Sequence, residues 1–304
     1  MSTRITNQMI SRSVLADLND VSNRLAKTQQ RMTSGKQITR ASDDPYGASR
    51  ALTLRGELGA TQQYQRNVSE ASAWQDVTDS ALSTISDVVH RAQELTVQGA
   101  SDGAGPAARV AAAQEIDQLI ESVKQAANAS YGGRFVFSGT ATNVQPYAVG
   151  GADAYAGDSG VVAREIGPGV SVQVNVLGSA LLGSGQGAAD GKLLNVLRDI
   201  SQHLKSGTAA DANSLRTTDL KGLATGLDTL STLRATVGAT TNRLTSANGR
   251  LQQVEESTTK LLSDVEDADM AKTYTDFSMQ QSVYQSALKA GANIVQQSLL
   301  DFLR

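Results

Sequence analysis

The chain contains no cysteine and only two histidines among its 304 residues. Without cysteine it has no disulfide, no thiolate metal site and no thiol nucleophile. The two histidines, His90 and His203, offer little material for a zinc site or a catalytic triad, and no Gly-x-Ser-x-Gly elbow accompanies them. We therefore expect a protein that is not an enzyme, with no catalytic residue, no metal site and no bound cofactor.

Aromatic residues and prolines are also scarce. The chain has one Trp, seven Tyr, four Phe and four Pro, and 41 of its apolar residues are alanine. Side chains this small do not fill a wide globular core, whereas closely packed helices accommodate them well. The composition thus favours a mainly α protein with a long, thin helical bundle.

The chain also lacks a strong net charge and a long hydrophobic run. Its 27 Lys and Arg nearly balance 30 Asp and Glu, which predicts no binding to nucleic acid. No apolar stretch near the N-terminus is as long as a cleavable secretory signal requires. The longest uncharged stretch, residues 166–189, is interrupted by glycines and a proline, so we expect no membrane insertion.

Glycine is concentrated in one part of the chain, since 14 of the 27 lie between Gly132 and Gly191. The flanking sequences are rich in helix-forming residues and show apolar seams at helical spacing, as over 74–95 and 223–262. Inside the glycine-rich part, residues 134–139 and 169–176 alternate with the period of half-buried strands. The predicted domains are paired terminal coiled-coil helices (1–44 and 264–304), a helical stem (45–131 and 192–263) and a β-rich inserted domain (132–191).

The N-terminal helix is expected to end at Gly35, a residue that readily adopts the left-handed conformation of a helix C-terminus. A short connector then leads to the sequence Ser42, Asp43, Asp44, Pro45. Paired carboxylates could serve acid-base chemistry or bind a divalent ion. A structural turn is the favoured interpretation, because Asp44 can cap the next helix and Pro45 suits its first position.

The C-terminal helix is predicted to open with a capping box formed by Ser263 and Glu266. Each terminal helix carries a narrow apolar seam with no neighbouring segment in the sequence to cover it, and isolated helices are marginal in water. We therefore expect the two helices to pair with each other and to be buried further between copies of the chain. The predicted assembly residues are Val14, Leu18, Val21, Leu25, Met32, Phe277, Tyr284, Leu288, Val295 and Phe302.

Three segments resemble the flagellin and hook-associated protein family, in particular its hook-filament junction members. The segments are residues 31–52, which include Thr-Ser-Gly-Lys and Ser-Asp-Asp-Pro-Tyr-Gly-Ala, residues 133–140 (Gly-Arg-Phe-Val-Phe-Ser-Gly-Thr) and residues 265–271 (Val-Glu-Asp-Ala-Asp-Met-Ala). Flagellins are similar in the first segment but usually lack counterparts of Lys36 and Pro45. The terminal Arg304, in contrast, is a flagellin-like feature, so a short flagellin that forms the filament itself stays the alternative.

The resemblance implies a structural component of the bacterial flagellum, located outside the cell, that links the hook to the flagellin filament. It further implies export by the flagellar type III system and assembly through the terminal helices. The implied partners are other copies of the chain, the preceding hook-associated junction protein, flagellin, and an export chaperone on the C-terminal helix. A third hypothesis, independent of the resemblance, is an extracellular adhesion module in which residues 132–191 bind a ligand at the end of a coiled-coil stalk.

Overall fold

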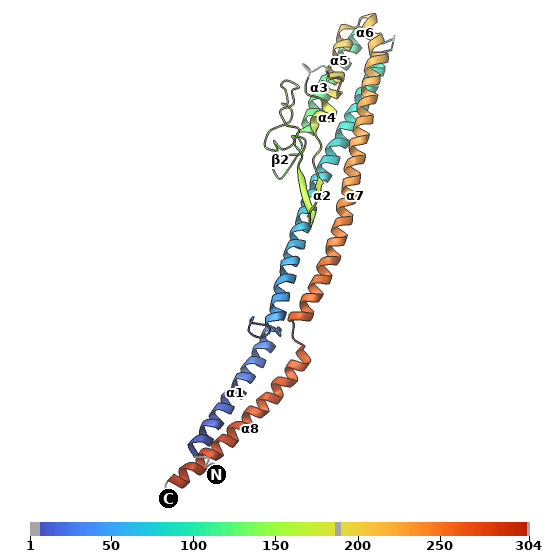
Figure 1. Ribbon diagram of the computed structural model, residues 1–304. Coiled ribbons are helices and arrows are strands. Elements are labelled where there is room, and N and C mark those ends of the chain that lie inside the picture. Colours follow the sequence, from blue (N-terminus) through green and yellow to red (C-terminus); the bar gives the residue numbers. More distant parts are fainter. Residues whose placement is uncertain (1–6, 102, 186–189, 303–304) are drawn as a thin grey trace. The chain divides into compact units, whose positions relative to one another are not determined.

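A computed structural model describes residues 7–101, 103–185 and 190–302 (Figure 1). These residues form long helices and two small sheets of two strands each, which confirms the prediction of a mainly α fold. The chain divides into two compact units, a terminal unit of residues 1–60 and 254–304 and a stem unit of residues 61–253. The helices are α1 (Asn7–Ser34), α2 (Pro45–Gly99), α3 (Pro106–Ala127), α4 (Gly178–Leu182), α5 (Leu193–Ser206), α6 (Ala209–Ser214), the π-helical turn η2 (Leu215–Asp219), α7 (Leu220–Glu266) and α8 (Met270–Phe302).

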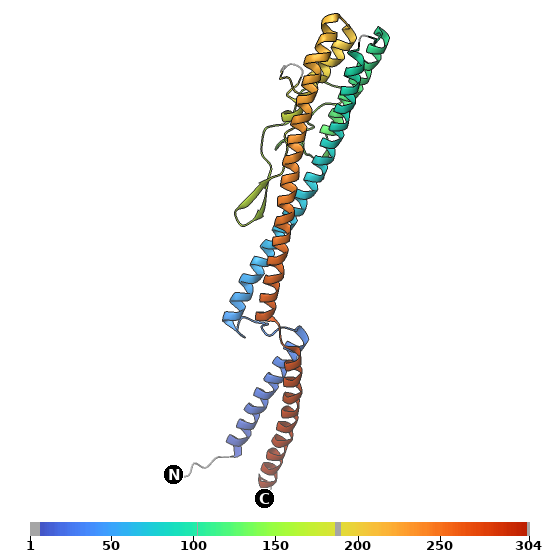
Figure 2. The ribbon, with the colours of Figure 1, turned by 90° about the vertical axis from the view of Figure 1, so that its right-hand side faces the viewer.

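The core of the stem unit lies between α2, α3, α5 and α7, which run side by side (Figures 1 and 2). The predicted seams of α2 and α7 are buried there, as Trp74, Ile85 and Leu244 illustrate. Alanines such as Ala92 and Ala113 are fully buried between the helices, so the small side chains permit close helix packing. Most residues of the two seams therefore belong to the core of the subunit itself.

The segment between α3 and α5 contains less β-structure than the sequence pattern suggests. Its strands are β1 (Ser130–Tyr131), β2 (Arg134–Phe135), β3 (Ala163–Gly167) and β4 (Val170–Gln173), paired antiparallel as β1–β2 and β3–β4. The expected strand over 134–139 is wrong beyond Phe135, because the successive residues Val136 and Phe137 are both buried and Gly139 has a φ of 69°. The second expected strand is shortened from 169–176 to Val170–Gln173.

The helix before the last one continues further than predicted. α7 runs to Glu266, and Ser263 donates to the Asp267 carboxylate at 2.6 Å, so the expected capping box of Ser263 and Glu266 is wrong. The last helix, α8, instead begins at Met270. The carboxylate of the preceding residue, Asp269, accepts from the Lys272 backbone N–H at 3.1 Å and so caps this helix. Several acidic side chains in this segment can cap a helix, and the packing of the chain selects Asp269.

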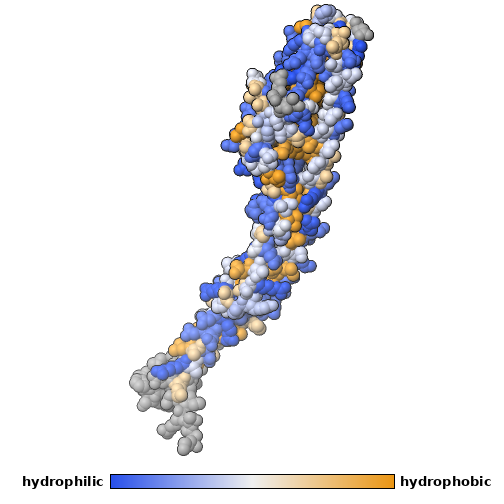
Figure 3. All heavy atoms as spheres, turned by 45° about the horizontal axis from the view of Figure 1, so that its top comes forward, coloured by the Kyte–Doolittle hydropathy of each residue, from blue (hydrophilic) through white to orange (hydrophobic). Residues whose placement is uncertain are grey.

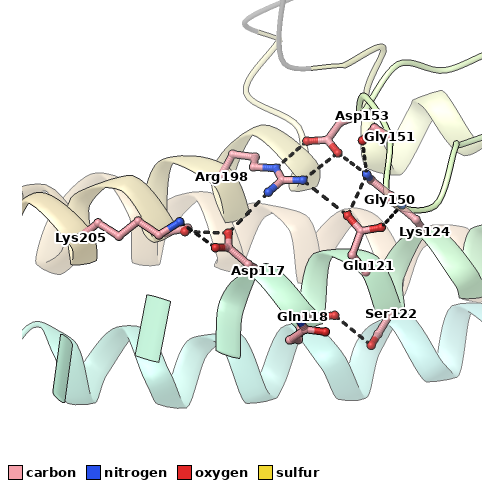
Figure 4. Close-up of polar contacts among 11 residues, drawn as sticks. Asp117, Gln118, Glu121, Ser122, Lys124, Gly150, Gly151, Asp153, Arg198 and Lys205 are labelled. Atoms are coloured by element: carbon pink, nitrogen blue, oxygen red, sulfur yellow. Dashed lines mark hydrogen bonds and ion pairs between the residues drawn. The ribbon is translucent and has the colours of Figure 1, made fainter. Parts of the chain in front are cut away.

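A network of charged side chains attaches the loop around Asp153 to the stem helices (Figure 4). The fully buried Lys124 of α3 places its Nζ 2.6 Å from Asp153 Oδ1 and 3.0 Å from Glu121 Oε1. From α5, Arg198 reaches Asp153 Oδ2 through Nε at 2.7 Å. The network extends to Asp117, which accepts from Lys205 at 2.7 Å. A buried ammonium is tolerated here because its carboxylate partners and the Gly151 carbonyl surround it.

The network also shifts the titration of its acids. Burial alone would raise the pKa of Asp153, but hydrogen bonds from Arg198 and Lys124 outweigh it and hold that pKa below the ordinary 3.8. The pKa of Asp117 is lowered in the same way, by Lys205, Ser201 and Arg198 against the effect of burial. Both carboxylates therefore favour the folded state at neutral pH.

Replacing Lys124 by methionine should lower the free energy of unfolding by about 3 kcal/mol, because the change leaves a buried carboxylate with one cation fewer. Urea unfolding of the full chain measures the effect. The control is Arg91→Met, which removes an exposed guanidinium that lies 2.7 Å from Glu115 and 2.9 Å from Glu94. The control should change stability far less. If both variants lower the free energy of unfolding equally, the burial of Lys124 does not make its ion pair more important for stability than an exposed one.

Acidification should destabilise the wild-type protein more than the variant Asp153→Asn. The folded-state pKa of Asp153 is depressed, so its contribution is fully present above about 3.8 and is lost as the pH falls through the folded-state value. The variant should be less stable at pH 7 and should lose less stability between pH 5 and pH 3. Melting temperatures across this range provide the measurement, with the exposed Asp264→Asn as control. Parallel curves for Asp153→Asn and wild type would contradict the assignment.

Candidate assembly surface

The terminal unit is built around the pairing of α1 with α8, the two helices nearest the chain ends (Figures 1 and 2). Thr28 of α1 donates from Oγ1 to Gln280 Oε1 of α8 at 3.0 Å. Further along, a Cβ placed on Gly291 of α8 would lie 3.3 Å from Val14 and 3.4 Å from Leu18. Glycine at this position therefore lets the two helices approach closely.

The predicted assembly residues of α1 face α8 of the same chain. Val21 is 9% exposed. The other four, Val14, Leu18, Leu25 and Met32, are half-buried. Their spacing of three and four residues keeps them on one side of the helix. The α1 seam therefore packs largely against α8 of the same subunit. Each half-buried residue still exposes part of its apolar surface to solvent.

The predicted residues of α8 are divided between two environments. Phe277 and Tyr284 are half-buried, whereas Leu288 is 43% exposed. The side chains of Val295 and Phe302 lie outside those that the structure describes. Because 3.6 residues complete a helical turn, a seam with this spacing drifts around the helix, and Leu288 lies beside the face that contacts α1.

Sequence reasoning missed several exposed apolar side chains of the terminal unit that lie away from the seams. They are Met9, Leu15, Tyr46, Leu52, Val254, Leu261, Met270, Tyr274, Met279 and Val283. Among the described residues of this unit, only Val21, Ala51 and Leu54 are buried hydrophobic side chains. On the face drawn in Figure 3, apolar residues form separate spots toward the end that holds both termini. The sequence could have indicated these residues, because they are apolar but fall outside the seam spacing of their helices, and such positions are candidates for contact with a partner.

The end of α1 and the link between α7 and α8 lie side by side and are hydrogen-bonded to each other. We call this connection, residues 35–37 and 266–268, the clasp. The Gln37 N–H donates to the Glu266 carbonyl at 2.7 Å, and the Ala268 N–H donates to the Gly35 carbonyl at 2.9 Å. Lys36 and Asp267 form an isolated antiparallel bridge. Gly35, with a φ of 68°, ends α1 as predicted. Two of the segments that carry the family resemblance therefore meet in space.

The clasp is also an ionic connection. Lys36 Nζ lies 2.6 Å from Asp267 Oδ1 and 3.6 Å from Glu266 Oε2, and Arg55 of α2 binds the Glu266 carboxylate. A carboxylate at the last position of a helix is opposed by the helix dipole, so these cations stabilise it. The hydrogen bond with Asp267 raises the pKa of Lys36, and the one from Lys36 lowers the pKa of Asp267. The clasp is therefore ionised at neutral pH.

The four residues of the predicted structural turn surround the start of α2. Asp44 Oδ1 accepts from the backbone N–H groups of Tyr46 at 3.1 Å and Gly47 at 3.0 Å, which is a helix-capping geometry. Pro45 occupies the first helical position, and Ser42 is exposed. A Cβ on Gly47 would lie 2.5 Å from both Asp44 Oδ2 and Ile38 Cδ1, so this turn has no room for a larger residue.

The neighbouring Asp43 is occupied in the same connector. Its Oδ2 accepts from the Thr39 hydroxyl at 3.0 Å and from the Arg40 N–H at 3.1 Å, and Lys27 Nζ lies 2.8 Å from Oδ1. Hydrogen bonds from Lys27 and Thr39 lower the pKa of Asp43 well below its ordinary range. Both carboxylates of the acidic pair thus have structural partners. No metal-ligating cluster of His, Cys, Asp or Glu occurs in the part of the chain that the structure describes.

None of the described helices is both long enough and apolar enough to cross a bilayer. The long helices instead carry polar residues on most of their exposed surface, as the blue and white areas of Figure 3 show for one face.

Family models and known relatives account for both ends of the chain. The model of the bacterial flagellin N-terminal helical region matches residues 5–142, and that of the bacterial flagellin C-terminal helical region matches residues 220–303. Flagellar hook-associated protein 3 of Escherichia coli (strain K12) is 26% identical over 306 residues, which cover 94% of this chain and 95% of that protein. Flagellin of Bacillus subtilis (strain 168) is also 26% identical, over 99% of this chain and 100% of that protein.

A solved structure shares the fold. The crystal structure of FlgL from Bacillus cereus matches with a TM-score of 0.58 and 22% identity, covering 69% of this chain and 99% of that one. The matched models include the clasp segments, the capped start of α2 and nearly all of α8. The chain therefore belongs to the flagellin and hook-associated protein family of flagellar structural proteins.

Proposed function

We propose that this protein joins the flagellar hook to the flagellin filament and assembles through its terminal unit. The observation that carries the proposal concerns the described side chains of that unit: three hydrophobic ones are buried, whereas many others, including Tyr274 and Met9, are exposed. Apolar surface of this extent, on α1, α8 and the adjoining ends of α2 and α7, is removed from water when copies of the chain pack together. The same residues would contact the preceding hook-associated protein on one side and flagellin on the other.

One observation favours the junction over a short flagellin. Lys36 and Pro45, which flagellins usually lack, have defined places here, Lys36 in the clasp and Pro45 at the first position of α2. The similar identity of the Bacillus subtilis flagellin keeps the alternative open to experiment.

The thin packing of the terminal unit also supports export through the flagellar type III system. A pair of helices with few buried apolar contacts unfolds at low cost, which suits passage through a narrow channel. A chaperone that covers the apolar face of α8 before export would protect it from aggregation. Once outside the cell, the chain would gain most of its terminal stability from neighbouring subunits.

Deletion of the gene should yield cells that retain their hooks but release flagellin into the medium, because the filament then has no base to grow on. Electron microscopy and immunoblotting of the supernatant measure the two effects, and restoring the gene is the control. If the protein is a short flagellin, the purified chain will instead polymerise into long filaments by itself. Such filaments, or filaments that stay attached in the deletion strain, would refute the junction role.

Tyr274→Lys should abolish assembly at the hook without destabilising the free subunit. Tyr274 is 66% exposed in the free chain, so the charge costs little there, within about 0.5 kcal/mol, whereas a buried subunit interface does not accept it. Motility, hook-bound protein and the melting temperature of the purified subunit are the readouts. The matched control is Val97→Lys, at an exposed position of α2 in the stem unit. Normal motility of Tyr274→Lys would remove this face of α8 from the interface.

A further inference from the structure

The stem unit contains a surface cavity of about 330 Å³ that is open to solvent. It lies between Trp74 of α2 and the loops and strands that follow α3, within a single compact unit. Its volume falls within the range of small-molecule sites in proteins. The lining residues are Trp74, Arg134, Thr140, Thr142, Val161, Val162, Ala163 and Arg164.

Hydrogen-bond donors predominate in this lining. Trp74 is 2% exposed, and its buried indole Nε1 has no hydrogen-bond partner. Arg134 is exposed and has no ion-pair or hydrogen-bond partner among the described residues, and the half-buried Thr142 has no hydroxyl partner there either. An unpaired buried donor is costly, and an exposed guanidinium without a protein partner can bind an anion.

The nearby carboxylates do not compete for these donors, because each has partners of its own. Asp158 accepts from the backbone N–H groups of Thr140 at 2.6 Å and Gly160 at 2.9 Å, and also from the Thr140 hydroxyl. Glu70 binds one terminal nitrogen of Arg164 at 3.0 Å. None of the lining residues is itself acidic. The cavity therefore has an excess of donors and a surplus positive charge at Arg134.

The fold determines where Arg134 lies. Gly132 and Gly133, with φ values of 57° and 77°, form the two-residue turn between β1 and β2, and Arg134 is the first residue after it. Two consecutive positive φ angles are required by the tight turn that matches strand twist, and glycine adopts them without strain. Val161, which is 58% exposed, and the half-buried Val162 supply the apolar wall of the cavity.

We propose that this cavity binds a small organic acid, whose carboxylate is held by Arg134 and Thr142 and whose carbon skeleton lies against Trp74 and the valines. The planar guanidinium matches a carboxylate through two parallel hydrogen bonds. The apolar wall favours an organic acid, whose carbon skeleton can pack against it, over an inorganic anion, which makes no apolar contact.

The chain provides its own reporter for this site, because Trp74 is its only tryptophan. Succinate is the probe, titrated into the full-length protein at constant ionic strength, with calorimetry to detect binding and tryptophan fluorescence to locate it. Succinamide is the uncharged analogue of the same shape, and inorganic phosphate is the anion without a carbon skeleton. We expect a saturable signal in both methods for succinate, with a dissociation constant of about 1 mM, and none for the other two.

Arg134→Gln should weaken succinate binding at least about tenfold, and Thr142→Val by a smaller factor, while circular dichroism shows an unchanged fold. Arg91→Gln, an exposed position of α2 outside the cavity lining, should bind as the wild type does. Absence of heat and fluorescence change with succinate would overturn the proposal. Binding that Arg134→Gln leaves intact would place the ligand elsewhere and would also overturn it. Equal binding of phosphate would refute the assignment to an organic acid.

Discussion

Two helices cannot enclose a hydrophobic core, because each has only one neighbour to cover its apolar side. This geometric constraint separates the two units of the protein. In the stem unit, four helices surround Ile116, Ile120 and Leu197 and exclude water from them completely. In the terminal unit, α1 and α8 cover one seam and leave the apolar side chains beside it in contact with solvent. The stem thus buries its core within one subunit, whereas the terminal unit leaves apolar surface exposed to water.

The stem depends on polar as well as apolar burial. Asp153, in a loop, accepts from Lys124 of α3 at 2.6 Å and from Arg198 of α5 at 2.7 Å. A buried ion pair of this kind adds little net stability compared with apolar residues of the same size. Its contribution is geometric, because the buried ammonium of Lys124 and the guanidinium of Arg198 bind the same loop carboxylate, and Lys124 also binds the Gly151 carbonyl of that loop. The network therefore ties the irregular segment to both α3 and α5.

Local sequence patterns predicted the local features of the structure and failed for the contacts between distant segments. The seams of α2 and α7, the end of α1 at Gly35 and the mainly α fold follow from helical periodicity and from the conformational freedom of glycine. The clasp joins residues 231 positions apart, and no pattern in either segment indicates that Lys36 meets Asp267. The strand expected over 134–139 failed for a related reason. Alternation predicts one buried face, but tertiary packing buries Val136 and Phe137 together.

The clasp has a consequence for the order in which the protein takes shape. Lys36 leaves the ribosome long before Asp267 is synthesised, so the terminal unit cannot close while the chain is being made. Contacts across so long a stretch of sequence also form slowly, whereas α2 and α3 of the stem follow each other in the chain and can pair by a more local encounter. The order of synthesis thus allows this part of the stem to form before the terminal unit closes. The contacts that close the terminal unit therefore form only after nearly the whole chain has been made, and they hold together segments that lie more than 200 residues apart.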